Sequence, residues 1–288
     1  MNCNTAGCSS QCASGSCSAN PPDARGKTSP SGVEKIATHH LNSIKHVIAI
    51  MSGKGGVGKS SITALLAVGL SQEGFKVGIL DADITGPSIP KMFGVKERPK
   101  VVNGGLSPVV TNTGIGIMSV NLLLEKEDDP VIWRGPIIAG AVRQFWSEVV
   151  WGNLDFLLVD LPPGTGDSPL TVLQSLPVQG VIIVSSPQDL AHMVVRKAVN
   201  MVKKMDLPIL GIVENMSSLQ CPHCKEIVEI FGHRSRTEDS LYEGMPMLGE
   251  VPIDPNLSRM CDEGVVEFYS NQLIGDLARK VLTSTKEI

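Results

Sequence analysis

Four glycines and two lysines occur together in "GKGGVGKS", a segment that runs from Gly53 to Ser60 directly after an apolar run. The segment satisfies the pattern G-x-x-x-x-G-K-[ST], in which glycines allow backbone N–H groups to turn inward around an anion. Lys59 supplies a positive charge for the outer phosphates of a nucleotide, and Ser60 supplies a hydroxyl ligand for Mg²⁺. The complete pattern, between an apolar strand and a helical segment, disfavours the alternative that the glycines only pack a tight turn.

Aspartates end two other apolar runs, where they can complete a site for phosphoryl transfer. "FLLVD" ends at Asp160, which suits a Mg²⁺-bound water, and "GILDAD" ends at Asp81 and Asp83, one of which can orient the attacking water. Phosphoryl transfer requires little of a protein beyond positioning and charge neutralisation. Each aspartate alone is equally well explained as a helix cap or a turn residue. Their assignment to the phosphoryl-transfer site therefore depends on the glycine-rich loop.

A pair of cysteines, Cys221 and Cys224 in "LQCPHCKE", has the C-x-x-C spacing that places two thiolates on one metal. A redox disulfide is the weakest interpretation, because no thioredoxin-like βαβ pattern surrounds the pair. A zinc knuckle needs four ligands, and the sequence holds no second C-x-x-C. A [4Fe–4S] cluster shared by two subunits would obtain two thiolates from each chain. The residues alone leave the shared cluster and zinc both open.

The first forty residues contain further cysteines in a polar, small-residue context, with almost no large apolar side chain before Val33. Such a composition does not offset the entropy of ordering, so we expect a flexible tail over residues 1–40 and one domain over 41–288. A second metal or cluster site in the tail is one hypothesis, and a zinc-binding or unstructured tail is the other. Its candidate ligands are Cys3, Cys8, Cys12 and Cys17. Cys261 is expected to be an ordinary side chain.

Short apolar runs alternate with helical patterns from Lys45 onward, and these elements must position the chemical groups. The phosphate loop lies between an expected strand at 46–51 and an expected helix at 60–72. Near-continuous apolar runs, each followed by a helix, predict an α/β fold with a doubly wound, mostly parallel sheet and helices on both faces. The last helix is expected from about Glu267 to Thr285, packed on the sheet.

Composition excludes several classes of function. The 288 residues are 42% hydrophobic and carry a formal net charge of −4, which argues against a nucleic-acid-binding face. No apolar run approaches the length of a membrane span, and no signal or transit peptide is recognisable, so a cytoplasmic protein is expected. In that reducing compartment, closely spaced cysteines are more often metal ligands than disulfides.

The second lysine of the loop, Lys54, makes the segment resemble the deviant Walker A class of P-loop ATPases. That class includes the MinD and ParA proteins, the nitrogenase iron protein and the Mrp-type iron–sulfur carriers. The resemblance implies that Lys54 reaches the nucleotide of a partner subunit while Lys59 serves its own, so that a homodimer encloses ATP. On this basis we assign catalysis to Lys54, Lys59 and Asp83, and Mg²⁺ binding to Ser60, Asp83 and Asp160.

Within the class, the chain is most similar to the Mrp family from about Lys45 to its end. The resemblance is carried by "MSGKGGVGKS", "LDADITGPSIP", "WRGP", "DLPPGTGD", "ENMS", "CPHC", "IFG" and "GEVPIDP". It implies that Asp83 lies in a first switch, that Asp160 to Asp167 form a second, and that Asn215, at the end of a strand, hydrogen-bonds adenine. The nucleotide-binding residues expected in all are Gly53, Lys54, Gly55, Gly56, Val57, Gly58, Lys59, Ser60, Ser61 and Asn215. The spacing of the tail cysteines differs from that of the four-cysteine site in eukaryotic cytosolic relatives.

The function implied is that of a homodimeric, ATP-hydrolysing carrier or scaffold, which binds a [4Fe–4S] cluster at the dimer interface. Its expected partners are cluster-assembly proteins and apo iron–sulfur proteins, with no nucleic acid and no membrane. The alternative from another class is a positioning or partitioning ATPase of the MinD or ParA type. The cysteine pair and the acidic charge distinguish the two. A metallochaperone for zinc or nickel is a further rival.

Overall fold

The computed structural model describes residues 36–83, 86–102, 104–124, 135–231 and 245–286. All of them belong to one compact unit, Glu34–Ile288. The four candidate ligands of the tail (Cys3, Cys8, Cys12 and Cys17) and most of the expected flexible segment lie outside the described residues, as do Trp133 and Arg134 of "WRGP". Over the described ranges, no helix combines the length and the apolar character needed to cross a membrane.

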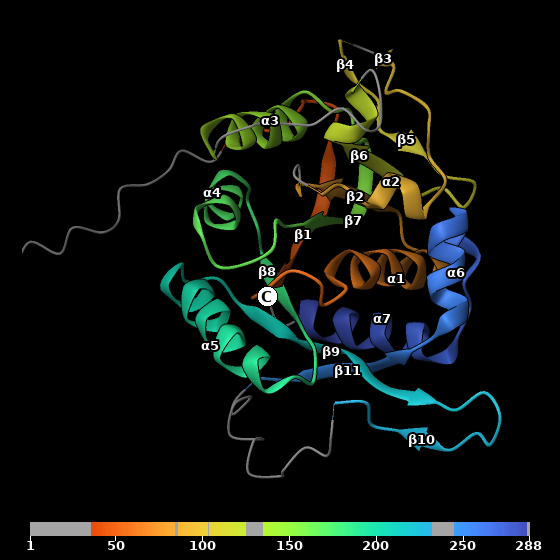
Figure 1. The fold of residues 1–288 in the computed structure, drawn as a ribbon. Helices are drawn as coiled ribbons and strands as arrows, with labels where there is room; N and C mark the ends of the chain where they lie inside the picture. Colours follow the sequence, from red (N-terminus) through yellow and green to blue (C-terminus); the bar gives the residue numbers. More distant parts are fainter. Residues whose placement is uncertain (1–35, 84–85, 103, 125–134, 232–244, 287–288) are drawn as a thin grey trace, which may run out of the picture. The chain divides into compact units, whose positions relative to one another are not determined.

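A mostly parallel sheet forms the centre of the unit (Figure 1). Within the described residues it contains nine strands, in the order β10-β9-β8-β1-β7-β2-β6-β5, with β11 also paired to β9. The antiparallel pairs are β10 with β9 and β5 with β6. The strands are β1 (Ser43–Ser52), β2 (Val77–Asp81), β5 (Val109–Val110), β6 (Gly116–Ser119), β7 (Asn153–Asp160), β8 (Gly180–Ser185), β9 (Ile209–Gln220), β10 (Ile227–Val228) and β11 (Met247–Ile253). Two further short strands, β3 (Val101–Val102) and β4 (Gly105–Leu106), pair with each other.

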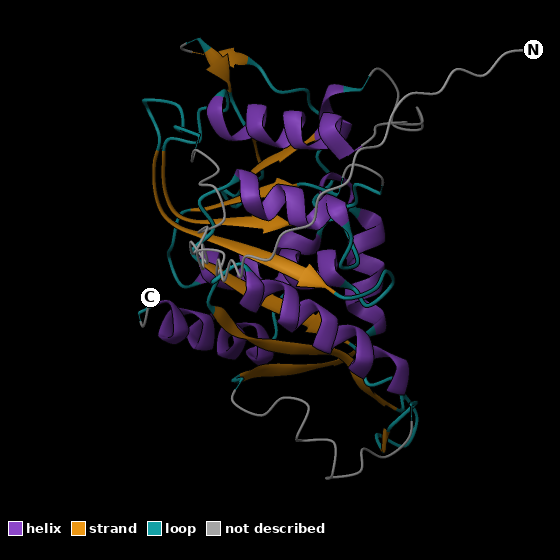
Figure 2. Ribbon diagram, turned by 90° about the vertical axis from the view of Figure 1, so that its left-hand side faces the viewer, coloured by secondary structure: helices purple, strands orange, loops and turns teal. Residues whose placement is uncertain are grey.

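Helices cover both faces of this sheet, as expected for a doubly wound fold (Figures 1 and 2). The core on one face includes side chains of α1 (Lys59–Gln72), α2 (Ile89–Met92), α6 (Pro255–Glu263) and α7 (Gln272–Thr285). The core on the other face includes side chains of α3 (Gly135–Ser147), α4 (Asp167–Ser175) and α5 (Asp189–Lys204). Short 3₁₀ helices occupy Val120–Leu123 and Val266–Phe268.

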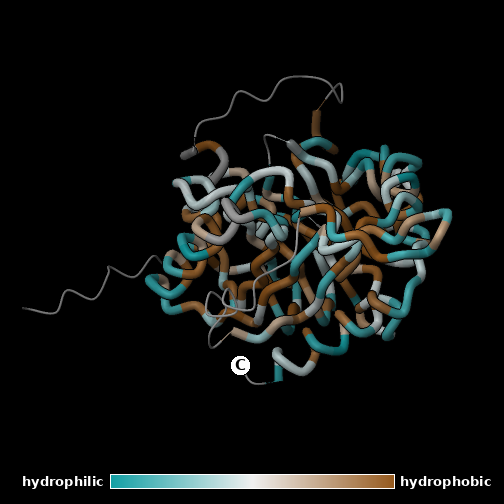
Figure 3. The backbone as a smooth tube through the Cα atoms, turned by 60° about the horizontal axis from the view of Figure 1, so that its bottom comes forward, coloured by the Kyte–Doolittle hydropathy of each residue, from teal (hydrophilic) through white to brown (hydrophobic). Residues whose placement is uncertain are grey.

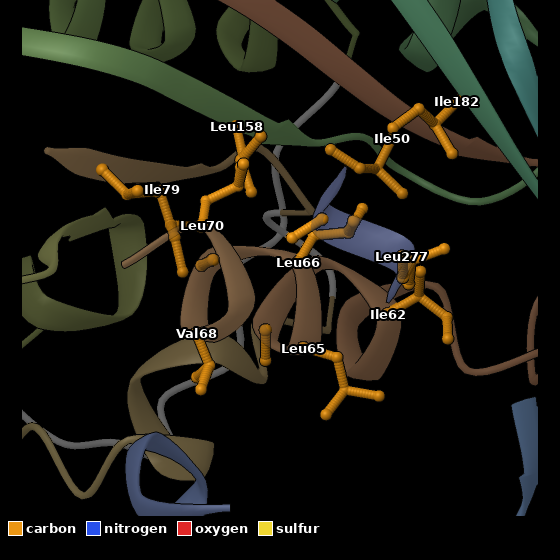
Figure 4. Close-up of a cluster of buried hydrophobic side chains, with 14 of the residues drawn as sticks. Ile50, Ile62, Leu65, Leu66, Val68, Leu70, Ile79, Leu158, Ile182 and Leu277 are labelled. Atoms are coloured by element: carbon orange, nitrogen blue, oxygen red, sulfur yellow. The ribbon is translucent and has the colours of Figure 1, made fainter. Parts of the chain in front are cut away.

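The apolar strand runs exist because both faces of the central strands are buried. In β1, Ile48 and Ile50 join the core that includes α1, whereas Val47, Ala49 and Met51 join the opposite core. Figure 4 shows Ile62 and Leu66 of α1 beside the strand residue Ile50. Hydrophobic segments accordingly concentrate inside the chain trace, and hydrophilic ones lie mainly at its outside (Figure 3).

The register of the parallel strands brings the polar residues to one edge of the sheet. Asp160 at the end of β7 pairs with Ile50 of β1 on one side and with Asp81 of β2 on the other. Because β1, β2 and β7 end together, the loop after β1 lies beside the carboxylates that end its neighbours. This edge, at the carboxyl ends of the strands, is where open α/β sheets bind ligands.

Two elements differ from the expected boundaries. The last helix begins at Gln272 rather than at Glu267, because the Asn271 side chain caps it by accepting a hydrogen bond from the Leu273 N–H at 3.2 Å. Glu267 instead accepts hydrogen bonds from Asn112 and Thr113. In addition, β9 does not end at Asn215 but continues to Gln220.

The close packing of α1 on α7 yields a prediction about a glycine inside α1. A Cβ atom at Gly69 would lie 2.6 Å from Ile274 Cγ2 and 2.9 Å from the Ile274 carbonyl oxygen. We expect Gly69→Ala to lower the free energy of unfolding by about 1–3 kcal/mol, despite the better helix propensity of alanine. Gly140, inside α3, has nothing within 4 Å of that position, so Gly140→Ala should stabilise by up to about 1 kcal/mol. Denaturant unfolding measures both, and equal stabilisation would contradict the α1–α7 contact.

Candidate functional site

The loop between β1 and α1 has the backbone shape of an anion site. Gly56 and Gly58 have φ angles of 80° and 78°, in the left-handed region that favours glycine. Gly58 caps α1 without any side-chain hydrogen bond, so the first N–H groups of the helix are open to a ligand. The loop borders a cavity of about 220 Å³. Its lining comprises Ser52, the range Gly55–Ser61, Asp83, Ser88, Met92 and Pro163.

A network of charged and hydroxyl groups lies beneath this cavity, centred on the fully buried Asp160. Lys59 Nζ lies 2.8 Å from Asp160 Oδ2, and the Ser60 hydroxyl donates to the same oxygen at 2.6 Å. The Thr63 hydroxyl donates to the other oxygen, Oδ1, at 2.7 Å. Three groups from the loop and from α1 thus hold one carboxylate of β7. The network fixes the loop, the helix and the strand end relative to one another.

The two aspartates after β2 have different surroundings, which separates their possible roles. Asp83 lines the cavity, and its Oδ2 lies 3.9 Å from Lys59 Nζ. Asp81 is buried beneath it and accepts hydrogen bonds from the Ser119 hydroxyl and the Asp83 N–H, each at 3.2 Å. Burial raises the pKa of Asp81 well above its usual value, and the nearby charge of Asp160 raises it further. Asp83 is therefore placed to act on a ligand, and Asp81 to support the strand end.

The donor set around the cavity suits a hard divalent cation. Asp83 and Asp160 each lie beside the ammonium group of Lys59, and Ser60 adds a hydroxyl group. Carboxylate and hydroxyl oxygens are the ligands that Mg²⁺ prefers, usually together with waters and substrate phosphates. The Ser60 hydroxyl donates its hydrogen bond to Asp160, so the lone pairs of the Ser60 oxygen remain available to a cation. Ser60, Asp83 and Asp160 therefore fit the expected cation.

Lys54 occupies a different place from Lys59. Its ammonium group donates a hydrogen bond to Oε1 of Gln188, the residue that caps α5 in the same chain. Gly53 beside it lies against α5 as well, because a Cβ there would meet Val194 Cγ1 at 2.5 Å. Neither Gly53 nor Lys54 lines the cavity. The structure thus brings Lys59 and Ser60 to the carboxylates, and it holds Lys54 on the side of α5.

Asn215 lies behind the phosphate loop, in the middle of β9. Its side chain is buried, and its Nδ2 donates to the backbone carbonyl of Val57 at 2.9 Å. The approach is close enough that a Cβ at Gly58 would fall 2.1 Å from this nitrogen. One N–H of the amide is engaged by the loop, and the side chain retains a second N–H donor and the acceptor Oδ1.

The cysteine pair lies at the turn that joins β9 to β10. The Cys221 N–H donates to the Glu226 carbonyl at 2.8 Å, and the Lys225 N–H donates to the Cys221 carbonyl at 3.0 Å. Hydrogen bonds from the backbone N–H groups of Cys224 and His223 lower the pKa of the Cys221 thiol, and the side chain of Cys224 contributes to the same effect. Both cysteines are free thiols. The turn therefore favours a thiolate, which is the form of cysteine that binds metals.

The described residues supply an incomplete set of metal ligands at this turn. Over the part of the chain that the structure describes, His, Cys, Asp and Glu side chains form no group of three or more able to hold a metal.

Apolar side chains next to the turn are exposed, and we call them the hairpin patch. The hairpin patch consists of Ile227, Val228, Ile230 and Phe231, with Ile227 69% exposed.

Sequence reasoning missed three residues that contact the site: Thr63, Gln188 and Met216. Thr63 lies one helical turn after Lys59, where a threonine gives no signal of its own. Gln188 and Met216 reach the loop only through the fold, since Gln188 bonds Lys54 and the Met216 Cε would lie 3.8 Å from a Cβ at Gly58. Long-range contacts of this kind leave no local pattern in the sequence.

Comparison with known proteins agrees with this geometry. The family model described as "NUBPL iron-transfer P-loop NTPase" matches residues 43–285. The iron-sulfur cluster carrier protein of Methanocaldococcus jannaschii is 48% identical over 228 residues, which cover 78% of this chain and 79% of the relative. A solved nucleotide-binding protein from Archaeoglobus fulgidus, in complex with ADP, is 46% identical. Its TM-score is 0.71, with 80% of this chain and 90% of that chain covered.

The fold is also shared with proteins of another function. The cell division ATPase MinD of Pyrococcus furiosus has a TM-score of 0.59 at 22% identity, over 83% of this chain and 98% of its own. At that identity the similarity shows the fold alone. The prediction of a doubly wound P-loop fold is confirmed, and the choice between functions depends on the family match and on the site.

The different positions of Asp81 and Asp83 predict different effects of removing their charges. We expect Asp83→Asn to reduce the turnover number for ATP by about 100-fold or more, because a group that positions or deprotonates the attacking water is lost. Asp81→Asn keeps the shape and should reduce turnover by less than about tenfold, since the buried carboxyl group does not reach the ligand. Steady-state phosphate release measures both. A larger loss in the Asp81 variant would reverse the assignment.

The hydrogen bonds of the cysteine turn predict the pH dependence of its reactivity. A lowered pKa means that the Cys221 thiolate persists to lower pH, so alkylation by iodoacetamide should rise at a pH below the usual thiol value of about 8.5. Burial and Asp262 raise the pKa of Cys261 to about 11, which makes it an internal control that reacts only in more alkaline solution. Peptide mass spectrometry of the metal-free protein follows both sites. Equal midpoints for the two thiols would refute the stabilising role of the turn.

Proposed function

The chain belongs to the NUBPL iron-transfer P-loop NTPase family, and we propose that it is an ATP-binding, ATP-hydrolysing carrier of [4Fe–4S] clusters. In this proposal it receives clusters from assembly proteins and delivers them to apo iron–sulfur proteins. The observation that carries the proposal is the pairing of a phosphate site with a thiolate half-site on one chain. Asn215 contacts the loop, and Cys221 and Cys224 follow on the same strand and its turn.

The nucleotide side of the proposal follows from the network around Asp160. The open N–H groups of α1 and the Lys59 ammonium hold the phosphates, while Asp160 fixes the position of Lys59. Ser60, Asp83 and Asp160 would hold Mg²⁺, which supplies charge neutralisation at the phosphate oxygens when bound. Asp83 orients a water toward the γ-phosphorus and takes up its proton. The new phosphorus–oxygen bond forms as the bond to the bridging oxygen of the leaving ADP breaks.

The amide of Asn215 gives the site a preference for adenine. Because one N–H of Nδ2 is engaged by the Val57 carbonyl, we assign Oδ1 as the acceptor for the base. Adenine carries a donor, its exocyclic amino group, at the position where guanine carries a carbonyl acceptor. The amino group of adenine can donate a hydrogen bond to Oδ1 of Asn215, whereas the carbonyl oxygen of guanine would be repelled by it. This geometry supports ATP rather than GTP as the substrate.

A second copy of the chain would complete the cluster site. A cubane cluster takes four cysteine thiolates, and the turn of one chain supplies two. The hairpin patch beside them offers exposed apolar surface that such a contact would bury. In the same homodimer, Lys54 would leave Gln188 and reach the nucleotide of the partner. The thiolates of Cys221 and Cys224 suit a reducing cytoplasm, where they do not form disulfides.

The rival functions explain fewer features of the phosphate site and the cysteine turn. A positioning ATPase of the MinD type accounts for the phosphate site, but it gives no role to the hydrogen-bonded Cys221 turn. A zinc carrier does use the turn, since zinc also accepts four thiolates in a shared site. Cluster and zinc differ in inorganic sulfide, which only the cluster contains.

Anaerobic reconstitution with iron and sulfide tests the proposal. We expect about two iron and two sulfide ions per chain, because one cluster serves two chains. Cys221→Ala should retain almost none, whereas Cys261→Ala, which removes a half-buried thiol outside the turn, should match the wild type. The wild-type cluster should activate an apo iron–sulfur enzyme. Zinc without sulfide in the purified protein, or full iron and sulfide loading of Cys221→Ala, would refute the proposal.

A further inference from the structure

The phosphate loop and the cysteine turn are joined by a single strand. In β9, Asn215 bonds the Val57 carbonyl of the loop at 2.9 Å, and Cys221 follows six positions later (215 to 221). At the rise of an extended strand this separation is at most about 20 Å. Figure 1 shows β9 running from the sheet to the peripheral β10 turn. The strand is thus a direct covalent connection between the two sites.

The pairing of β9 changes just after Asn215. Its contact with β8 ends at Glu214, and its pairing with β11 shifts register between Val251 and Ile253, opposite Asn215 and Leu219. The first part of β9 is therefore enclosed between two parallel strands, and the second part leaves β8 and carries the turn. A strand that loses a neighbour in mid-course has a natural point for bending.

Met216 lies at this point, in a backbone conformation that disfavours its residue type. Its φ angle is 61°, in the left-handed region that glycine and asparagine enter more readily. Residues held in such conformations are strained and persist where the surroundings enforce them. Here the surroundings include the loop, because Met216 Cε would lie 3.8 Å from a Cβ at Gly58. The strain is located between the nucleotide contact and the cysteines.

The second switch offers no comparable route. The segment from Asp160 to Asp167 contains no cysteine, and it follows β7, which β1 and β8 separate from β9 in the sheet. It contacts the phosphate loop, because the Gly164 N–H donates to the Ser52 carbonyl at 3.0 Å. The path through Asn215 and Met216 instead follows one strand from the loop to the turn.

We propose that Asn215 and Met216 are positioning residues that transmit occupation of the adenine site to the Cys221–Cys224 turn. The inference rests on the proposed function, since it requires that Asn215 binds the base. When the base bonds Oδ1, the amide is held between the ligand and the Val57 carbonyl, and Met216 carries this constraint into the outer part of β9. The orientation of the turn, and with it the exposure of the two thiols, then depends on the nucleotide.

The test compares the alkylation rate of Cys221 in the metal-free protein without ligand, with Mg–ADP and with Mg–pyrophosphate. Pyrophosphate occupies the phosphate loop but has no base. We expect Mg–ADP to change the rate by about fivefold or more, the lower range of coupling between sites. Mg–pyrophosphate should leave the rate within about twofold. In Asn215→Ala, at saturating Mg–ADP, the effect of the nucleotide should disappear.

Three variants at left-handed positions separate transmission from simple damage. Met216→Gly removes the conformational constraint and should abolish the response of Cys221 to Mg–ADP. Met216→Asn, which tolerates the left-handed region, should keep it. Asp206→Gly is the matched control, because Asp206 also has a positive φ, 53°, but lies in the turn that follows α5. It should respond as the wild type does.

The outcomes distinguish this inference from the proposed function. Calorimetry that finds no binding of Mg–ADP to the wild type would refute the nucleotide function itself. Binding with an unchanged alkylation rate, or a full response in Asn215→Ala, would overturn the transmission alone. Equal responses of Met216→Gly and Asp206→Gly to Mg–ADP would overturn the transmission as well.

Discussion

The burial of the Asp160 carboxylate is the constraint on which the rest of the site depends. A charge removed from water is tolerated only when it is paired and hydrogen-bonded, and Asp160 has Lys59, Ser60 and Thr63 as partners. Removing one partner of such a group typically destabilises a protein by about 3–5 kcal/mol. The same contacts therefore stabilise the fold and hold the phosphate loop in shape. Lys59 belongs to the core and to the binding site at once.

The surplus of carboxyl groups around Lys59 explains why this edge of the sheet should bind a cation together with a nucleotide. Burial raises the pKa of Asp81, and the charges of Asp160 and Asp83 raise it further. A divalent cation bound with a nucleotide would offset the mutual repulsion of these carboxyl groups. The cysteine turn has the complementary deficiency, since it has two thiolates where a cluster requires four. In the function proposed above, a second copy of the chain supplies the other two thiolates.

Much of this arrangement could be predicted from the sequence, because it depends on local patterns. The glycines and lysines of the loop, the apolar runs that end in aspartate and the C-x-x-C pair each have a spacing with one main physical use. The family resemblance selected Asp83, whereas the residue pattern alone left Asp81 and Asp83 equivalent, since their difference depends on which carboxyl group the fold buries. The contacts of Thr63 and Gln188 and the extension of β9 beyond Asn215 depend on packing between distant segments. Predicting that the last helix starts at Gln272 would have required recognising Asn271 as its N-cap. The tail cysteines remain a prediction.

Completion of the cluster site by a second chain is the central claim, and native mass spectrometry of the reconstituted protein tests it most directly. Under anaerobic conditions, the species that carries a four-iron cluster should have the mass of two chains plus one cluster. Protein without a cluster and without nucleotide should be mainly monomeric. With the four tail cysteines replaced by alanine, a complete cluster on a species with the mass of one chain would contradict the claim.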